Sequence, residues 1–139
     1  MPSAQELEDF FQQNKQQYRE QSYFQLSQII FTHAKYGGQA KDVARQALSD
    51  KEIDLAIKSE AINLNSVEID EHYGSEFSQK LIDLYVDQKN DPTCWAKPVT
   101  SKVGAHLICF KQVKLGAIPS ISSIRSLLIN DWRYAMTQQ

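Results

Sequence analysis

The stretch that most constrains the fold is residues 95–110 (WAKPVTSKVGAHLICF), which has the pattern of two short strands folded back on each other. The turn of this predicted hairpin lies at residues 101–104, where Gly104 supplies a crowded or positive-φ backbone position. Pro98 has no amide N–H, and it therefore fits a strand only at a sheet edge or where that donor is not needed. Because side chains alternate along a strand, we expect His106 and Leu107 on opposite faces of the sheet.

The charge and hydropathy of the chain argue against several classes of partner. Its 139 residues are enough to close a hydrophobic core, and its net charge is −2, with acidic and basic residues interspersed. A nucleic-acid partner would need a concentrated basic stripe, and we expect no such partner. No apolar run approaches the about 20 residues of a membrane span, and no signal segment opens the sequence, although a trimmed precursor would look the same. No Cys/His spacing suits zinc, so we expect no metal site.

The two cysteines, Cys94 and Cys109, flank the predicted turn. If the hairpin turns around residues 101–104, Cys94 falls nearer Gln112 than Cys109, and a disulfide needs Cα atoms within about 7 Å of each other. We therefore expect two free thiols, with Cys109 as a small buried core residue, and keep a disulfide as the alternative.

Local patterns divide the chain into helices around a small sheet. Residues 3–20 have the pattern of a polar helix in which Ser3 and Glu6 form a capping box, and residues 21–32 switch to strand character. The other expected elements are helices at 39–48 and 51–58 (the second capped by Ser49 and Asp50), an extended piece at 63–69, a helix at 70–86, a turn at 87–93, the hairpin, a linker at 115–119 and a helix at 120–137. Helices set apart from a small, mostly antiparallel sheet of about four strands make an α+β fold.

The hairpin resembles the closing hairpin of parvulin-type peptidyl-prolyl isomerases, the PpiC or rotamase family. In that family a Gly-Pro-Val-x-(Ser/Thr)-x-x-Gly-x-His-(Leu/Ile)-Ile pattern ends the domain, and residues 97–108 (KPVTSKVGAHLI) match it with Lys97 in place of the usual glycine. Three further segments are similar to family motifs: LSQIIF at 26–31, DEHYGSEFSQKL at 70–81 and PSISSIR at 119–125. The second of these is similar to a divergent bacterial branch. The resemblance implies a parvulin-like domain at residues 21–115 with accessory helices at 1–20 and 116–139.

The resemblance also implies a site. It would comprise an apolar slot for a proline ring, formed by Phe77, Tyr73 and Leu64, and a polar catalytic floor, formed by His106, Gln28 and Ser101. Parvulins usually carry two histidines side by side, and here Gln28 stands in place of the first. The family's Cys or Asp after the first long helix has no clear counterpart. An X–Pro bond rotates over a barrier of about 18–20 kcal/mol without any bond being broken, so this change can reduce catalysis without abolishing it.

The implied function is a peptidyl-prolyl isomerase domain that binds proline-containing, extended or unfolded polypeptide and needs no cofactor. A non-catalytic parvulin-fold chaperone or assembly module is the alternative. A small structural domain whose terminal helices mediate oligomerisation is a third reading. Under any of these readings, we expect the apolar residues of the terminal helices, such as Leu7 and Trp132, to pack on each other, or else to meet a second copy of the chain in a homo-oligomer or a missing part of a longer chain. The resemblance is compatible with the periplasm or the cell envelope.

The implied site makes geometric predictions. Gln28 and His106 should lie within hydrogen-bonding distance, about 2.7–3.2 Å, or share a water. Phe77 should be partly exposed in a cleft, with Tyr73 on its rim and Ser101 nearby, so that Phe77→Ala affects peptide binding more than stability. Without the resemblance, His106 is a hydrogen-bonded core histidine, Phe77 is ordinary core and Ser101 is a turn residue.

Overall fold

A computed structural model describes residues 1–88 and 94–138 of the chain. These residues divide into two compact units: Gln21–Leu115 forms one, and the two terminal segments, Met1–Glu20 and Gly116–Gln139, together form the other. Of the turn predicted over residues 87–93, all but Asp87 and Gln88 lies outside the described residues.

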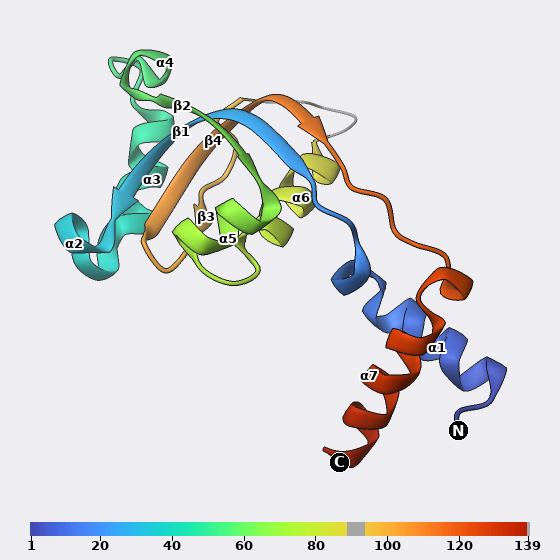
Figure 1. Cartoon of the computed structure of the whole chain (residues 1–139). Helices are drawn as coiled ribbons and strands as arrows, with labels where there is room; N and C mark the ends of the chain where they lie inside the picture. The colour runs from blue at the N-terminus through green and yellow to red at the C-terminus, as the bar shows by residue number, and fades with distance from the viewer. Residues whose placement is uncertain (89–93, 139) are drawn as a thin grey trace. The chain divides into compact units, whose positions relative to one another are not determined.

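The larger unit is built on a four-stranded antiparallel sheet in the order β2-β1-β4-β3 (Figure 1). Its strands are β1 (Tyr23–Thr32), β2 (Glu60–Asn65), β3 (Val99–Thr100) and β4 (Gly104–Lys114). The strand predicted at 21–32 from its β-branched and aromatic residues is β1. It pairs with both β2 and β4. Helices pack on this sheet, and the predicted α+β fold is confirmed.

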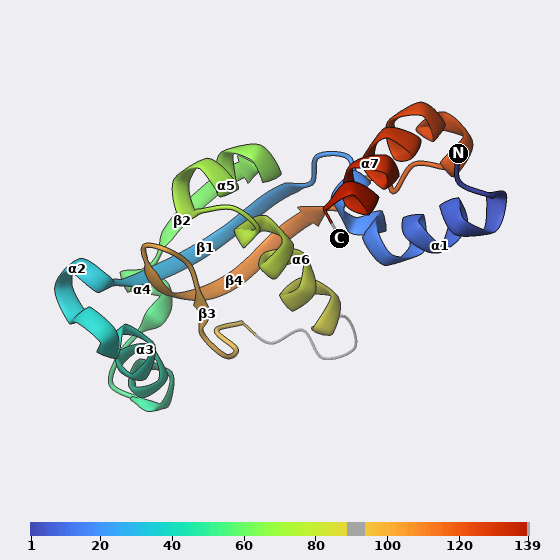
Figure 2. The ribbon, with the colours of Figure 1, turned by 90° about the horizontal axis from the view of Figure 1, so that it is seen from below.

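Helices cover both faces of the sheet. On one face, α5 (Ser66–Tyr73) and α6 (Phe77–Asp87) pack against Ile108 of β4, and on the other α3 (Ala40–Ser49) packs against Leu107. Leu107 and Ile108 are consecutive, so their side chains point to opposite faces, as the predicted alternation requires. Figure 2 shows α5 and α6 next to each other over the sheet, with α3 apart from them. Single-turn helices α2 (His33–Tyr36) and α4 (Leu55–Lys58) and the 3₁₀ turn η2 (Gly37–Gln39) complete the unit.

The single helix predicted at 70–86 is wrong, because the chain breaks it in two. Helix α5 ends at Tyr73, where Gly74 has φ 104° and its N–H donates to the Asp70 carbonyl. Glu76 then has φ 71°, and α6 begins at Phe77. A positive φ is easily adopted by glycine and ends a helix, which the continuous apolar periodicity of this segment conceals.

Two neighbouring predictions are also wrong in their bounds. The extended piece predicted at 63–69 ends at Asn65, because Asn65 forms a capping box with Glu68 that starts α5. The helix predicted at 51–58 is reduced to the single turn Leu55–Lys58, capped by Asp54. The carboxylate of Asp50 accepts from the Glu52 N–H and holds a turn there instead of a helix start.

The expectation of two free thiols is wrong, because Cys94 and Cys109 form a disulfide with Cα atoms 4.4 Å apart. The hairpin does turn where predicted, with Val99 opposite His106. However, β3 is only two residues long, and Trp95 has φ 59°, which breaks the regular register. The Trp95 N–H donates to the Ile108 carbonyl, and Cys94 is thereby brought beside Cys109.

The smaller unit is helical and is formed by the N-terminal and C-terminal segments of the chain. It contains α1 (Ala4–Asn14), the 3₁₀ turns η1 (Lys15–Tyr18) and η3 (Ile121–Ser123), and α7 (Arg125–Thr137). The predicted Ser3–Glu6 capping box is present. Leu7, Phe11 and Leu128 form its buried core. The terminal helices therefore pack on each other, which is the first of the arrangements expected from the sequence.

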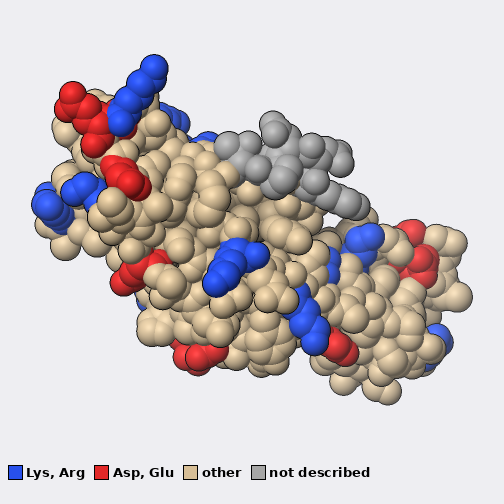
Figure 3. Space-filling model, turned by 90° about the horizontal axis from the view of Figure 1, so that it is seen from above, with Lys and Arg blue, Asp and Glu red and all other residues tan. Residues whose placement is uncertain are grey.

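Charged side chains are dispersed on the face of the molecule seen in Figure 3, where groups of both signs alternate with large uncharged areas. In the part of the chain that the structure describes, no helix is both long enough and apolar enough to cross a membrane.

Candidate functional site

The candidate site is organised around His106, which is fully buried on β4. Ile30 of β1 lies opposite His106 and Gln28 lies opposite Ile108, which places Gln28 and His106 on the same sheet face at diagonal positions. The Nδ1 atom of His106 lies 3.0 Å from Oε1 of Gln28, which is also buried. The predicted hydrogen bond between the two side chains is therefore confirmed.

The other ring nitrogen of His106 contacts the turn between β3 and β4. Its Nε2 atom lies 2.6 Å from Ser101 Oγ, and that oxygen accepts the Val103 N–H at 3.1 Å. Because the Gln28 oxygen can only accept, Nδ1 of His106 carries the ring proton and Nε2 accepts the Ser101 hydroxyl proton. The partners on both sides thus fix one tautomer of the histidine.

The amide nitrogen of Gln28 extends this chain of hydrogen bonds to α5. It donates to the Tyr73 hydroxyl at 2.7 Å. Ser101, His106, Gln28 and Tyr73 therefore form one continuous sequence of hydrogen bonds, here called the polar row, across β4 and β1 and up to the end of α5.

Two aromatic rings cover the polar row. The Phe77 ring centroid lies 4.5 Å from that of His106, and the Tyr73 ring meets His106 edge-on at 4.9 Å. Tyr73 is partly buried, but Phe77 is only 2% exposed, which contradicts the expectation of a partly exposed phenylalanine. The break before α6 turns the Phe77 side chain onto the sheet. The start of α6 is held in place by the Asp70 carboxylate, which accepts from both the N–H and the hydroxyl of Ser78. Phe77→Ala would therefore cost stability, by about 3–5 kcal/mol, and is a poor probe of binding.

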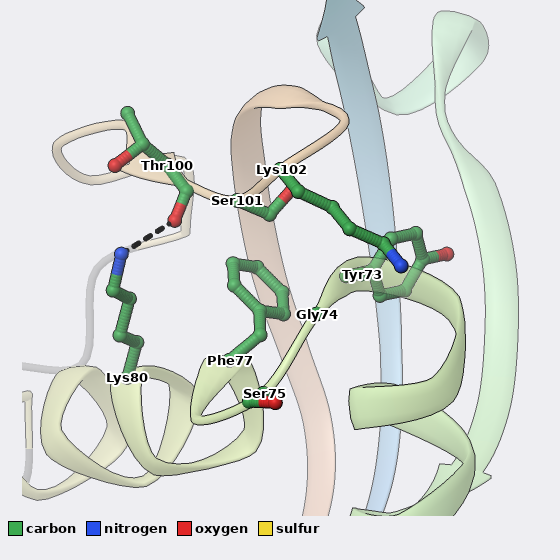
Figure 4. A pocket seen from close by; sticks show the side chains of 8 residues that line it. All are labelled: Tyr73, Gly74, Ser75, Phe77, Lys80, Thr100, Ser101 and Lys102. Atoms are coloured by element: carbon green, nitrogen blue, oxygen red, sulfur yellow. Dashed lines mark hydrogen bonds between the residues drawn. The ribbon is translucent and has the colours of Figure 1, made fainter.

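A pocket of about 300 Å³ opens above this floor (Figure 4). Its lining combines the predicted Tyr73, Phe77 and Ser101 with residues that sequence reasoning did not single out: Gly74, Ser75, Lys80, Thr100 and Lys102. Predicted Leu64 does not line it, since Leu64 packs from β2 against the core below. Lys80 lies one helical turn after Phe77, and Lys102 lies within the hairpin motif, so both positions were open to prediction from the helix and hairpin periods.

The electrostatics of the site keep His106 neutral. Burial, and to a smaller extent the nearby positive charge of Lys80, together lower the pKa of His106 to about 4. At neutral pH the polar row consequently carries no charge, which agrees with the tautomer that its hydrogen bonds select.

A larger hollow of about 590 Å³ lies along the end of β1. It is lined mainly by apolar side chains of β1, α3 and the segments around α2 and α4, and by none of the predicted site residues. The smaller pocket is the candidate site because polar and aromatic groups converge there. No cluster of three or more metal-ligating side chains occurs among the residues that the structure describes.

The comparison with protein families identifies the family of the chain. The model of the PPIC-type PPIase domain matches residues 2–126, which is most of the chain. The chain therefore belongs to the PPIC-type peptidyl-prolyl isomerase family and contains a rotamase-like domain of the parvulin type. No curated protein and no solved structure matches it.

Proposed function

We propose that the larger unit binds extended, proline-containing polypeptide in the pocket above Phe77 and speeds rotation about the X–Pro bond. The observation that supports this function is the convergence of Tyr73 and Phe77 on a buried, neutral and fully hydrogen-bonded histidine. A proline ring is apolar and flat-sided, and it fits a pocket whose floor is aromatic.

The reaction needs a pocket that binds the twisted amide more tightly than the planar one. Resonance makes the planar amide the more polar form and gives a rotation barrier of about 18–20 kcal/mol. Contact with the rings of Tyr73 and Phe77 would remove water from the amide and so disfavour its planar form. No bond is broken, and no group in the pocket has to act as a nucleophile.

The polar row would serve this reaction by fixing the position of the Ser101 hydroxyl. That hydroxyl donates to His106 and accepts from the Val103 N–H, so its remaining lone pair has a fixed direction. Gln28 holds His106 in one tautomer as a second histidine would, but it cannot carry a charge. The mechanism therefore relies on position and polarity and not on proton transfer.

Exchange spectroscopy on an acetylated and amidated Ala-Ala-Pro-Phe peptide tests the proposal. Catalytic amounts of the full chain should raise the cis–trans exchange rate in proportion to protein concentration. Tyr73→Ala should lower this rate at least about ten-fold because it removes one wall of the pocket and one end of the polar row. Tyr134→Ala, which changes an exposed tyrosine of the smaller unit, is the matched control and should leave the rate unchanged.

A non-catalytic binding module of the same fold is the second candidate. It is favoured by one observation, which is that Gln28 occupies the position of the first family histidine and leaves the polar row without a second titratable ring. Saturable peptide binding at the pocket without any acceleration of exchange would identify this function in place of catalysis.

The Cys94–Cys109 disulfide bears on the compartment in which the protein is located, whichever of the two functions it has. Disulfides persist in secreted, periplasmic and cell-surface proteins and are rare where thiols are kept reduced. We therefore propose that the Cys94–Cys109 bond forms in an oxidising compartment, which is compatible with the periplasm or the cell envelope.

A further inference from the structure

The pocket above Phe77 carries positive charge without an acidic counterpart. Lys80 and Lys102 are among the eight residues that line it, and none of the other six is acidic. Figure 4 shows the two lysines on opposite sides of the Phe77 ring, Lys80 on α6 and Lys102 on the turn that follows β3. The chain as a whole has a net charge of −2, so this local excess of positive charge is a property of the pocket and not of the molecule.

Lys102 is positioned by its surroundings. Its N–H donates to the Tyr73 carbonyl at 3.3 Å, which ties the turn to the end of α5. A Cβ atom at Gly74 would lie 3.4 Å from Cγ and Cδ of Lys102, so the lysine stem passes directly over this glycine. Among the described residues, Lys102 takes part in no ion pair.

Lys80 is held on the other side of the pocket. Its ammonium group donates to the Thr100 carbonyl at 2.8 Å, which links α6 to β3. A carbonyl satisfies one of its three donors, and Lys80 takes part in no ion pair among the described residues, although Asp83 and Asp87 line the adjoining hollow. The positive charge of Lys80 acts within the site, since it contributes to the low pKa of His106.

We propose that these two lysines make the pocket selective for polypeptide segments in which an aspartate or glutamate stands next to the proline. A proline ring over Phe77 would place the side chains of its neighbours toward one lysine or the other. A carboxylate on either side would gain a positively charged partner. This inference rests on the proposed binding of proline-containing segments, and it adds the chemistry of the neighbouring residue.

A panel of acetylated and amidated peptides tests the inference with the full chain. Four peptides carry glutamate or its neutral isostere glutamine, either directly before or directly after the proline. Binding is measured by NMR titration and isomerisation by exchange spectroscopy, both at low salt and at 0.5 M NaCl. An exposed ion pair contributes up to about a five-fold change in affinity. We therefore expect the glutamate peptide to be preferred by about two- to five-fold in at least one position, and salt to reduce this preference.

Charge reversal supplies the decisive variant. Lys102→Glu should invert the preference, so that the glutamine peptide is bound better than the glutamate peptide, and Lys80→Gln should reduce it. Lys111→Gln, on an exposed position of β4, is the matched control and should keep the preference of the natural chain. Equal binding of the glutamate and glutamine peptides, or a preference that survives Lys102→Glu, would overturn the inference. Binding with the expected preference but without accelerated exchange would sustain it and reject catalysis, and binding of neither peptide would reject both.

Discussion

At the scale of single residues, the chemistry of the site depends on how His106 is held. The ring is buried, accepts from Ser101 on one nitrogen and donates to Gln28 on the other. These contacts satisfy the neutral ring completely, and a proton added to Nε2 would have to displace the Ser101 hydroxyl proton from its bond. The histidine is thus built into the fold in its neutral form.

This environment makes the stability of the protein depend on pH. The pKa of His106 is lowered to about 4 in the folded chain, whereas an unfolded histidine has a pKa of about 6.5. Between these values only the unfolded chain binds the proton. The free energy of unfolding is therefore highest above pH 6.5, and it decreases as the pH falls toward 4. The loss should amount to roughly 3 kcal/mol, measured as the free energy of unfolding in urea at several pH values.

The contribution of His106 is isolated by substitution. His106→Gln should flatten the curve between pH 6.5 and 4 relative to the natural chain, since a glutamine does not titrate. His72→Gln changes an exposed histidine of α5 and should retain the full slope. A His106→Gln curve that runs parallel to that of the natural chain would show that the histidine is not held neutral.

Part of the site follows from the sequence at this scale, and part does not. The resemblance to the parvulin family places Gln28 beside His106, because the two residues occupy the two histidine positions of that family on neighbouring strands. The bond from Gln28 to Tyr73 depends on how closely α5 approaches the sheet, which spacing does not encode. The depth of Phe77 depends in the same way on the φ values of Gly74 and Glu76.

At the scale of elements, the β3–β4 hairpin depends on the close approach of Gly104 to β1. The sequence predicted that Gly104 occupies either a crowded or a positive-φ position. The position is a crowded one, because only Gly37 and Gly74 among the described glycines have positive φ. A Cβ atom at Gly104 would overlap the Phe31 carbonyl oxygen and lie 2.8 Å from the Thr32 Cα. The obstacle is backbone, which cannot move without disturbing the pairing of β1 and β4.

Gly104→Ala should therefore destabilise the protein by about 2–3 kcal/mol, because two paired strands would have to separate locally. The measurement is the midpoint and slope of urea unfolding. Gly38→Ala is the matched control: a Cβ there meets nothing within 4 Å, and its effect should stay within about 0.5 kcal/mol. Similar stability of the two variants would contradict the crowding at β1.

Elements were predictable where one local signal dominates. The Ser3–Glu6 capping box and the aromatic, β-branched run of β1 are of this kind. The Asn65–Glu68 box carries the same signal, but the apolar residues around it favoured a strand. The disulfide was missed because it depends on the left-handed backbone of Trp95, a conformation that few residues other than glycine adopt and that no residue pattern announces.

At the scale of the whole molecule, the terminal helices form a unit with its own core. Leu128 of α7 is fully buried against Leu7 and Phe11 of α1, and the Tyr18 hydroxyl donates to the Asp131 carboxylate at 2.6 Å. This unit nevertheless leaves Leu127 and Tyr134 exposed on α7, at 52% and 69%. The homo-oligomer expected from the sequence stays a prediction, and these exposed residues are where contacts between copies would be sought.

Removal of residues 1–20 should cause the chain to associate, because it uncovers the apolar side of α7 around Leu128. Light scattering over a range of concentrations should show a mass that rises with concentration for the truncated chain. Gln13→Ala, at an exposed position of α1, serves as the control and should scatter like the full chain. A truncated chain that stays monomeric and equally stable would mean that α1 does not protect α7.

The two-part construction of the helical unit also has a consequence for the order of folding. Its halves are separated in sequence by the whole of Gln21–Leu115, so α1 leaves the ribosome long before α7 exists. Closing so long a loop is entropically costly while the intervening chain is disordered. Once the sheet unit has folded, β1 and the end of β4 are paired, with Tyr23 opposite Lys114, and the two halves start from neighbouring strands. Folding of the sheet unit thus shortens the effective loop, and the helical unit is expected to be the last part of the newly made chain to become native.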